Sequence, residues 1–167
     1  IESAVKIGLG YWRVTTKKAN AQYNEQDICI EPIPNALAVY LGPHIMPDGS
    51  DAEYGFIFAQ ITIDKFKRLY PGKRIDTQDF NDLDQAARDF WRPTETITVC
   101  EYFYTDYAKE GPEGESRWNG IKWVKMTGVE ILERTDWKGR YIPIVEVIGR
   151  ETVIRGKRVL WGLVRPA

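Results

Sequence analysis

The stretch DWKGRYIPIVEVIGRETVIRGKRVLWGLVRP, residues 136–166, reads as a β-strand followed by a β-hairpin. Its first part, 141–148, is dense in β-branched residues, and Gly149 interrupts the run as a turn residue would. Next, 152–154 and 158–161 stand on either side of an Arg-Gly-Lys triplet, the pattern of strand, tight turn and strand. The stretch therefore predicts a hairpin in this part of the chain.

Other strand patterns surround this hairpin. The run TITVCEYFYTDY, residues 96–107, is the strongest strand in the chain, and because it exceeds the usual strand length we expect it to cross the centre of a sheet. The aromatic run 54–61 reads as a core strand. Weaker strand patterns cover 5–16, 27–35, 36–41 and 120–133, with polar or turn-rich loops at 17–26, 43–53 and 108–119.

Helical periodicity is confined to two short segments. In 62–70, Ile63, Phe66 and Leu69 fall at helical spacing before Pro71. In 82–91, Asp82 can cap the helix that Pro93 stops. The predicted fold class is α+β, a mostly antiparallel β-sheet with two short helices, and the length of 167 residues predicts a single domain, 1–167.

Charge and hydropathy narrow the function classes. No apolar run approaches the roughly 20 residues that span a bilayer. The net charge of −1 gives no attraction of the whole chain to nucleic acid or membrane, but 134–167 holds eight basic and three acidic residues, an excess of +5. This excess fits a solvated hairpin face, and it also fits a surface that meets phosphates or an acidic protein.

Candidate catalytic and metal-binding groups are few. Cys29 and Cys100 lie in apolar runs, which favours reduced, buried thiols over a disulfide. The single histidine, His44, has no partner at zinc-ligand spacing. Glu101 and Asp106 should face opposite sides of their strand, so they cannot flank one bond as a catalytic pair. We expect no enzyme, no cofactor and no metal.

An acidic cluster begins the second predicted helix. Carboxylates are favoured at a helix N-terminus by its unpaired amide groups. The spacing of a calcium-binding loop and its closing glutamate are absent, so a structural role is favoured over calcium binding. The cluster comprises Asp76, Asp79, Asp82 and Asp84.

Aromatic residues make up 13% of the chain, and most should lie in the core. Trp12, Trp118, Trp137 and Trp161 stand beside polar or glycine residues and are candidates for partly exposed positions. Exposed tryptophans could anchor a protein interface or stack on sugars or bases. A carbohydrate- or nucleic-acid-binding β-domain is therefore the alternative function, and a row of coplanar exposed rings would support it.

The order and spacing of several short motifs resemble the portal proteins of short-tailed enterobacterial phages. The likeness spans nearly the whole chain, although no single motif is diagnostic. The motifs are GYWRV at 10–14, QDICIEPI at 26–33, DFW at 89–91, VCEYFY at 99–104, ERTDW at 133–137, IPIV at 142–145 and GLVR at 162–165.

This resemblance implies a head-to-tail connector at one capsid vertex of the virion, made in the bacterial host cytoplasm. About a dozen subunits would form a ring through which DNA is packaged and ejected. The expected partners are other portal subunits, terminase, capsid or scaffold proteins, tail adaptor proteins and DNA in the channel. No membrane partner is expected.

The resemblance also implies that the chain is an excised piece, the outer wing of a longer portal protein. The first residue is Ile1, and nothing caps the strand that ends near Ala167, where the family continues into stem helices. Stem and clip would then be missing, and the isolated chain should be a monomer. Residues near the wing–stem junction are the predicted subunit-interface or DNA-proximal site, with a neighbouring subunit favoured: Arg150, Arg155, Lys157, Arg158, Arg165 and Trp161.

Overall fold

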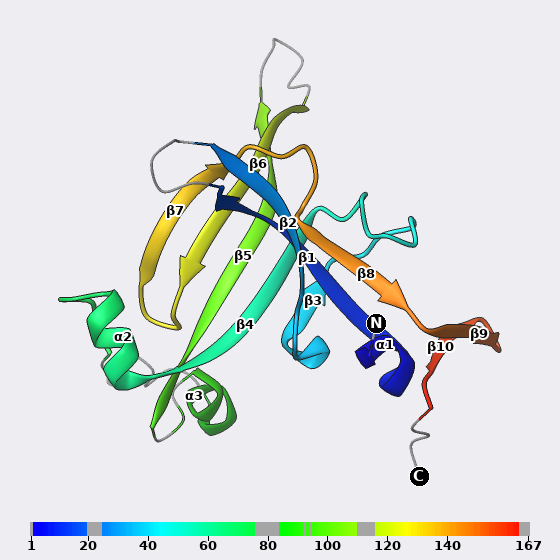
Figure 1. Ribbon diagram of the computed structural model, residues 1–167, viewed down its shortest axis with the longest axis horizontal. Helices are drawn as coiled ribbons and strands as arrows, with labels where there is room; N and C mark the ends of the chain where they lie inside the picture. The colour runs from blue at the N-terminus through cyan, green and yellow to red at the C-terminus, as the bar shows by residue number, and fades with distance from the viewer. Residues whose placement is uncertain are drawn as a thin grey trace. The chain divides into compact units, whose positions relative to one another are not determined.

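The computed structural model describes residues 2–19, 25–75, 84–91, 93, 95–109 and 116–163 (Figure 1). The chain divides into two compact units, one formed by 1–53 with 141–167 and the other by 54–140. Both are built mainly from antiparallel strands with short helices, which confirms the predicted fold class. The prediction of a single domain stays a prediction.

The unit 54–140 is organised around its longest strand. Strands β4 (Tyr54–Thr62), β5 (Thr96–Lys109), β6 (Ser116–Met126) and β7 (Ile131–Trp137) follow one another as antiparallel neighbours. Strand β5 pairs with β4 on one side and β6 on the other, as the pattern of 96–107 predicts. The register places Phe56 opposite Tyr102, and Tyr102 opposite Val124.

A helix covers one face of this sheet. Helix α2 (Ile63–Leu69) follows β4 directly, and the hydroxyl of Thr62 accepts a hydrogen bond from the amide of Lys65 at its start. Phe66 of α2 is fully buried against Ile97 and Val99 of β5. Burying this phenyl ring stabilises the unit by about 2–3 kcal/mol.

Helix α3 (Gln85–Trp91) packs at the same end of the unit. Phe90 lies edge-on to Phe58 of β4, with ring centroids 5.2 Å apart, and the hydroxyl of Thr98 donates to the carbonyl of Phe90 over 2.5 Å. The helix begins later than predicted, since the Asp84 carboxylate accepts from the amide of Ala87. Residues 76–83, with the other acidic positions of the cluster, lie outside the described residues.

The second unit contains a three-stranded antiparallel sheet. Strand β1 (Leu9–Lys18) lies between β2 (Gln26–Pro32) and β8 (Ile144–Ile148). The register pairs Thr16 with Ile28 at one end of β1 and Leu9 with Ile148 at the other. The β1–β2 arm, formed by the paired ends of these two strands, and the start of the terminal hairpin therefore lie at opposite ends of β1. That hairpin, predicted from sequence, is confirmed as β9 (Arg150–Ile154) and β10 (Lys157–Trp161).

The first strand prediction, 5–16, is wrong at its start. Residues Glu2–Ile7 form a helix, α1. Gly8 ends this helix with a φ of 85°, and its amide donates a hydrogen bond to the carbonyl of Ala4 over 3.0 Å. Only after Gly8 does the chain become extended. The alternating pattern of Val5 and Ile7 therefore does not mark a strand.

Other boundaries also differ from prediction. Residues Ala36–Ala38 form a 3₁₀ turn capped by Asn35, so β3 is only Val39–Leu41. The predicted strand 120–133 is two strands, because the amide of Thr127 donates to the carbonyl of Glu130 and closes a turn. Strand β6 begins at Ser116, inside the predicted loop 108–119.

No helix in the described part of the chain has both the length and the apolar character needed to cross a membrane.

Candidate functional site

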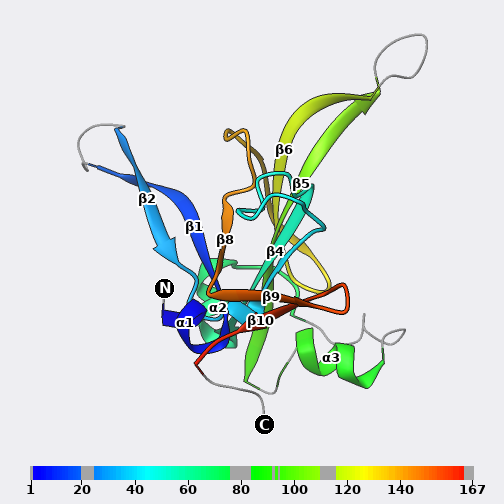
Figure 2. The same ribbon diagram turned by 90° about the vertical axis from the view of Figure 1, so that its right-hand side faces the viewer.

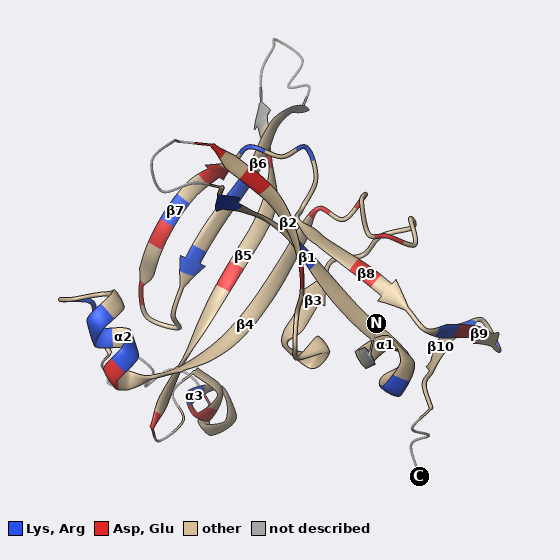
Figure 3. Cartoon of the chain, in the orientation of Figure 1, with Lys and Arg blue, Asp and Glu red and all other residues tan. Residues whose placement is uncertain are grey.

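The terminal hairpin carries an excess of positive charge, since the segment 150–158 has four basic residues and one acidic residue (Figure 3). Arg150, Arg155 and Lys157 are exposed, and Trp161 is half-buried. The side chain of Arg158 and the whole of Arg165 lie outside the described part of the structure. The structure thus brings Arg150, Lys157 and Trp161 together on one ribbon.

The turn of this ribbon has an uncommon backbone. Arg155 and Gly156 have φ values of 50° and 74°, the two positive angles of a type I′ hairpin turn, whose twist matches that of the strands it joins. Arginine rarely adopts this conformation. The turn projects the Arg155 side chain into solvent at the tip of the ribbon.

Strand alternation divides the ribbon into two faces. The register pairs Ile154 with Lys157, Thr152 with Val159, and Arg150 with Trp161. Because these pairs are two residues apart along each strand, all six side chains share one face. That face is amphipathic, with apolar groups at Ile154, Val159 and Trp161 and cations at Arg150 and Lys157.

Helix α1 holds the base of the ribbon by backbone contacts. The amide of Gly149 donates to the carbonyl of Gly8 over 2.9 Å, and the amide of Leu163 donates to the carbonyl of Val5 over 2.8 Å. A Cβ at Gly149 would overlap the carbonyl oxygen of Ala4. Glycine at 149 therefore lets the chain pass directly beneath α1 and enter β9.

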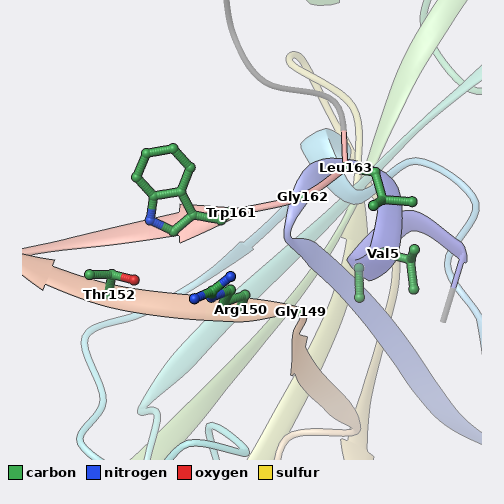
Figure 4. Close-up of a pocket in the computed structure, with 8 residues that line it drawn as sticks. Val5, Gly149, Arg150, Thr152, Trp161, Gly162 and Leu163 are labelled. Carbon is green, nitrogen blue, oxygen red and sulfur yellow. The ribbon is translucent and has the colours of Figure 1, made fainter.

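A groove of about 480 Å³ lies between α1 and the ribbon (Figure 4). Its apolar wall includes Val5 and Leu163, which is 80% exposed. Its other wall is the amphipathic face of the ribbon, at Arg150, Thr152 and Trp161. Sequence reasoning missed this groove, because Val5, which lies in α1, was predicted to begin a strand.

Three of the four tryptophans expected to be partly exposed have described side chains, and each of these is half-buried. Trp12 is in β1, Trp137 packs edge-on against Phe103 with centroids 5.9 Å apart, and Trp161 is in the ribbon. The side chain of Trp118 lies outside the described residues.

A different aromatic row lies on one face of the 54–140 sheet. The rings of Phe56 and Tyr102 are nearly parallel at 4.6 Å, and those of Tyr102 and Tyr104 at 5.0 Å. Phe56 also stacks with Phe58 at 6.0 Å. Each ring of this row stacks on at least one neighbouring ring, so the row contributes to the packing of the sheet face.

The candidate catalytic groups are engaged in structural contacts. Glu101 accepts a hydrogen bond from the Trp123 indole at 3.0 Å, while Asp106 lies 3.8 Å from the ammonium of Lys122. Trp123 and Lys122 are consecutive residues of β6, so their side chains point to opposite faces of the sheet. The carboxylates of Glu101 and Asp106, which contact them, therefore also face opposite sides, as predicted. Among the described residues, no cluster of histidine, cysteine or carboxylate side chains could hold a metal ion.

The two cysteines are free, as predicted, but only Cys100 is buried; Cys29 is half-buried on β2. Burial raises the pKa of Cys100 to about 12, aided by the nearby charge of Glu101. Its thiol is therefore protonated at neutral pH. The prediction that both thiols are buried is wrong for Cys29, because β2 is an edge strand.

The fold and the exposed hairpin define a strand-rich structural module. The family model of the phage P22-like portal proteins matches residues 1–167. The chain therefore belongs to the P22-like portal protein family. Portal proteins are structural components of the phage virion that assemble as oligomers with other phage proteins. A comparison with curated proteins finds no match to this chain.

Proposed function

We propose that this chain is the wing-type domain of a longer portal subunit. About a dozen such subunits would form a closed ring by repeating one heterologous contact. The ring would occupy one capsid vertex, where DNA is packaged and ejected and the head joins the tail. The observation that carries this proposal is the match of the portal family over residues 1–167.

The expected neighbours follow from this role. Other portal subunits flank the chain in the ring, terminase docks during packaging, capsid or scaffold proteins surround it, and tail adaptor proteins follow. DNA passes through the channel. The protein would be made in the bacterial host cytoplasm before it enters the virion, and we assign it no catalytic step.

Within this role, the terminal hairpin is the proposed subunit-facing site. Arg150, Arg155 and Lys157 are exposed on an isolated two-stranded ribbon. Such ribbons are marginally stable in water, so a ribbon gains stability when it packs on a partner. A neighbouring subunit fits better than DNA, because the ribbon combines these cations with Val153 and Ile154, which are exposed apolar groups. The remaining members of the site are Arg158, Arg165 and Trp161.

The test is the solution mass of the 167-residue chain beside that of the longest product of its reading frame. Light scattering and negative-stain microscopy should give a monomer for the chain and a closed ring for the longer product. A longer product that stays monomeric while either form binds an oligosaccharide or single-stranded DNA would replace the portal role with that of a binding domain.

A further inference from the structure

Strands β9 and β10 run side by side as a two-stranded ribbon (Figure 2), whose charges are divided unevenly between its two faces. Arg150 and Lys157 lie on the amphipathic face together with Trp161. Glu151 is the only acidic residue of 150–161, and strand alternation points it to the opposite face. In the part of the chain that the structure describes, no carboxylate forms an ion pair with Arg150 or Lys157. The amphipathic face is therefore cationic, with no acid of its own.

Apolar groups occupy the rest of this face and continue into the groove. Ile154 is 46% exposed beside the turn, and the indole of Trp161 is half-buried at the base of the ribbon. Beyond Trp161 the groove is bounded by Val5 and Leu163, which are 46% and 80% exposed. The hydrophobic effect favours a ligand that covers these groups.

This combination favours a protein ligand over nucleic acid. Surfaces that bind nucleic acid are more polar and more strongly cationic than surfaces that bind protein. The amphipathic face instead has two cations, Arg150 and Lys157, among three apolar side chains, those of Ile154, Val159 and Trp161. A ligand that matches it carries carboxylates for the cations and apolar side chains for the spaces between and beyond them.

The spacing of the two cations indicates the conformation of that ligand. Lys157 is opposite Ile154, which lies four residues beyond Arg150 along β9. At roughly 3.4 Å per residue, the two positions are about 14 Å apart along the ribbon. An extended peptide covers this distance in four residues, whereas four residues of an α-helix advance only about 6 Å. Carboxylates four residues apart on an extended segment can therefore reach both cations.

We propose that the amphipathic face binds an extended acidic segment of another protein chain. An apolar side chain at one end of this segment enters the groove beside Val5 and Leu163. Carboxylates two and six residues further along pair with Arg150 and Lys157, and an apolar side chain midway between them covers Val159. All four side chains point to the ribbon, because alternate residues of an extended chain share one side. This inference rests on the proposed subunit-facing site, since it names the chemistry of the partner that the site takes.

A peptide titration of the isotope-labelled 167-residue chain, followed by NMR, tests this inference. The probe is acetyl-Leu-Thr-Glu-Thr-Val-Thr-Glu-Thr-Leu-amide, whose sequence reads the same in both directions and so fits either orientation on the ribbon. It should shift the amide resonances of 4–5 and 149–163 and bind with a dissociation constant of about 1 mM or tighter. The matched peptide, acetyl-Leu-Glu-Thr-Thr-Val-Thr-Thr-Glu-Leu-amide, has the same composition. It should bind at least about tenfold more weakly, because alternation turns its carboxylates away from the ribbon.

Two double variants identify the cations that bind the probe. Arg150→Gln with Lys157→Gln should weaken binding by about tenfold or more, because the carboxylates lose their partners. Lys65→Gln with Lys67→Gln removes the same charge from exposed residues of the other unit and should leave binding unchanged. The comparison of the two peptides on the unaltered chain decides the inference even if a variant does not fold.

Equal binding of the two peptides, or a probe that leaves the resonances of 149–163 unchanged, would overturn the inference. A short duplex DNA that shifts these resonances when the probe does not would also overturn it, because the face would then bind phosphates. If the longest product of the reading frame forms rings although the chain does not bind the probe, the portal role stands and this inference fails. If the chain binds the probe as expected and the longer product forms no ring, the acidic partner stands and the ring fails.

Discussion

The Nε2 atom of His44 lies 3.1 Å from Oε2 of Glu146, and both side chains are largely buried. The Nδ1 atom lies 2.8 Å from the carbonyl oxygen of Gly42, which can only accept a hydrogen bond. An ionised carboxylate also only accepts, so both contacts are satisfied when both ring nitrogens carry protons. The pair therefore favours the imidazolium and ties the loop 43–53 to β8.

This geometry predicts a raised pKa for His44. The hydrogen bond to Gly42 raises the pKa most, and the hydrogen bond and charge of Glu146 and the charge of Asp51 add to it, against an opposing effect of burial. His44 is the only histidine, so its ring resonances can be followed by NMR without ambiguity. We expect a midpoint above the ordinary value of 6.5.

The sign of the stability effect follows from linkage. Because the folded-state pKa is above the unfolded one, protonated His44 contributes stability that is complete below pH 6.5 and lost as pH rises through the folded pKa. Urea unfolding across this range should show the free energy of unfolding falling. Glu146→Gln should lower the pKa and flatten this dependence. An unchanged His44 titration in that variant would show that the contact does not form in solution.

Alanine at Gly149 should cause a local defect, because backbone atoms of Ala4 and Gly8 lie against its Cβ position. Gly149→Ala places a methyl group against the carbonyl of Ala4, so α1 or the ribbon base must move, which costs about 1–3 kcal/mol of unfolding free energy. Gly72→Ala is the matched control, since nothing lies within 4 Å of its Cβ position and only its φ of 79° opposes the change, at about 1–2 kcal/mol.

Two measurements separate these variants. Limited proteolysis should cleave Gly149→Ala within 149–163 faster than the parent chain, because the ribbon loses its anchor on α1, whereas Gly72→Ala should not alter cleavage there. Equal proteolysis of both variants would mean that the close approach of Gly149 to α1 does not hold the ribbon.

The cysteines should react very differently with iodoacetamide. At pH 8, a thiol with a pKa near 12 is ionised to about one part in ten thousand, and Cys100 is also fully buried. Cys29 is half-exposed on an edge strand. Mass spectrometry should show one alkylation in the native chain, two in urea, and none in native Cys29→Ser. Native alkylation of Cys100 would contradict its placement in the core of the sheet.

Much of the fold could be predicted because its signals are local. The run 96–107 has enough β-branched and aromatic residues to identify the central strand β5, and Arg-Gly-Lys identifies the terminal turn. Helix α1 was missed because six residues carry little periodicity, and its end depends on the backbone angle of Gly8. The turn between β6 and β7 does contain Gly128, but a single glycine within a run of strand character did not mark it, and the hydrogen bond from Thr127 to Glu130 closes it.

The candidate site was predictable only in part. The basic residues of the hairpin are visible in the sequence, but which of them share a face depends on the pairing of Arg150 with Trp161. The groove needs Val5 and Leu163, which lie far apart in sequence and meet through the backbone of α1. Likewise, the contact of His44 with Glu146 spans 102 positions and leaves no local pattern.

Charge reversal on the ribbon tests the proposed subunit-facing site. Arg155→Asp with Lys157→Glu removes two exposed cations and keeps a residue that tolerates the positive φ at 155. If the ribbon meets an acidic neighbour, assembly of the longest product of the reading frame should weaken by about tenfold or more, because attraction becomes repulsion. Light scattering over a concentration series measures this change.

The matched control reverses Lys65 and Lys67 of α2, which are also exposed and belong to the other unit. Both double variants change the net charge equally, so only a specific contact separates their effects on assembly. Since the substitutions are on the surface, the thermal unfolding of each chain should change little. If the ribbon variant still assembles into rings at all concentrations, the hairpin is not part of the subunit interface. If the ribbon variant and the α2 control lose assembly equally, the loss is a general effect of charge.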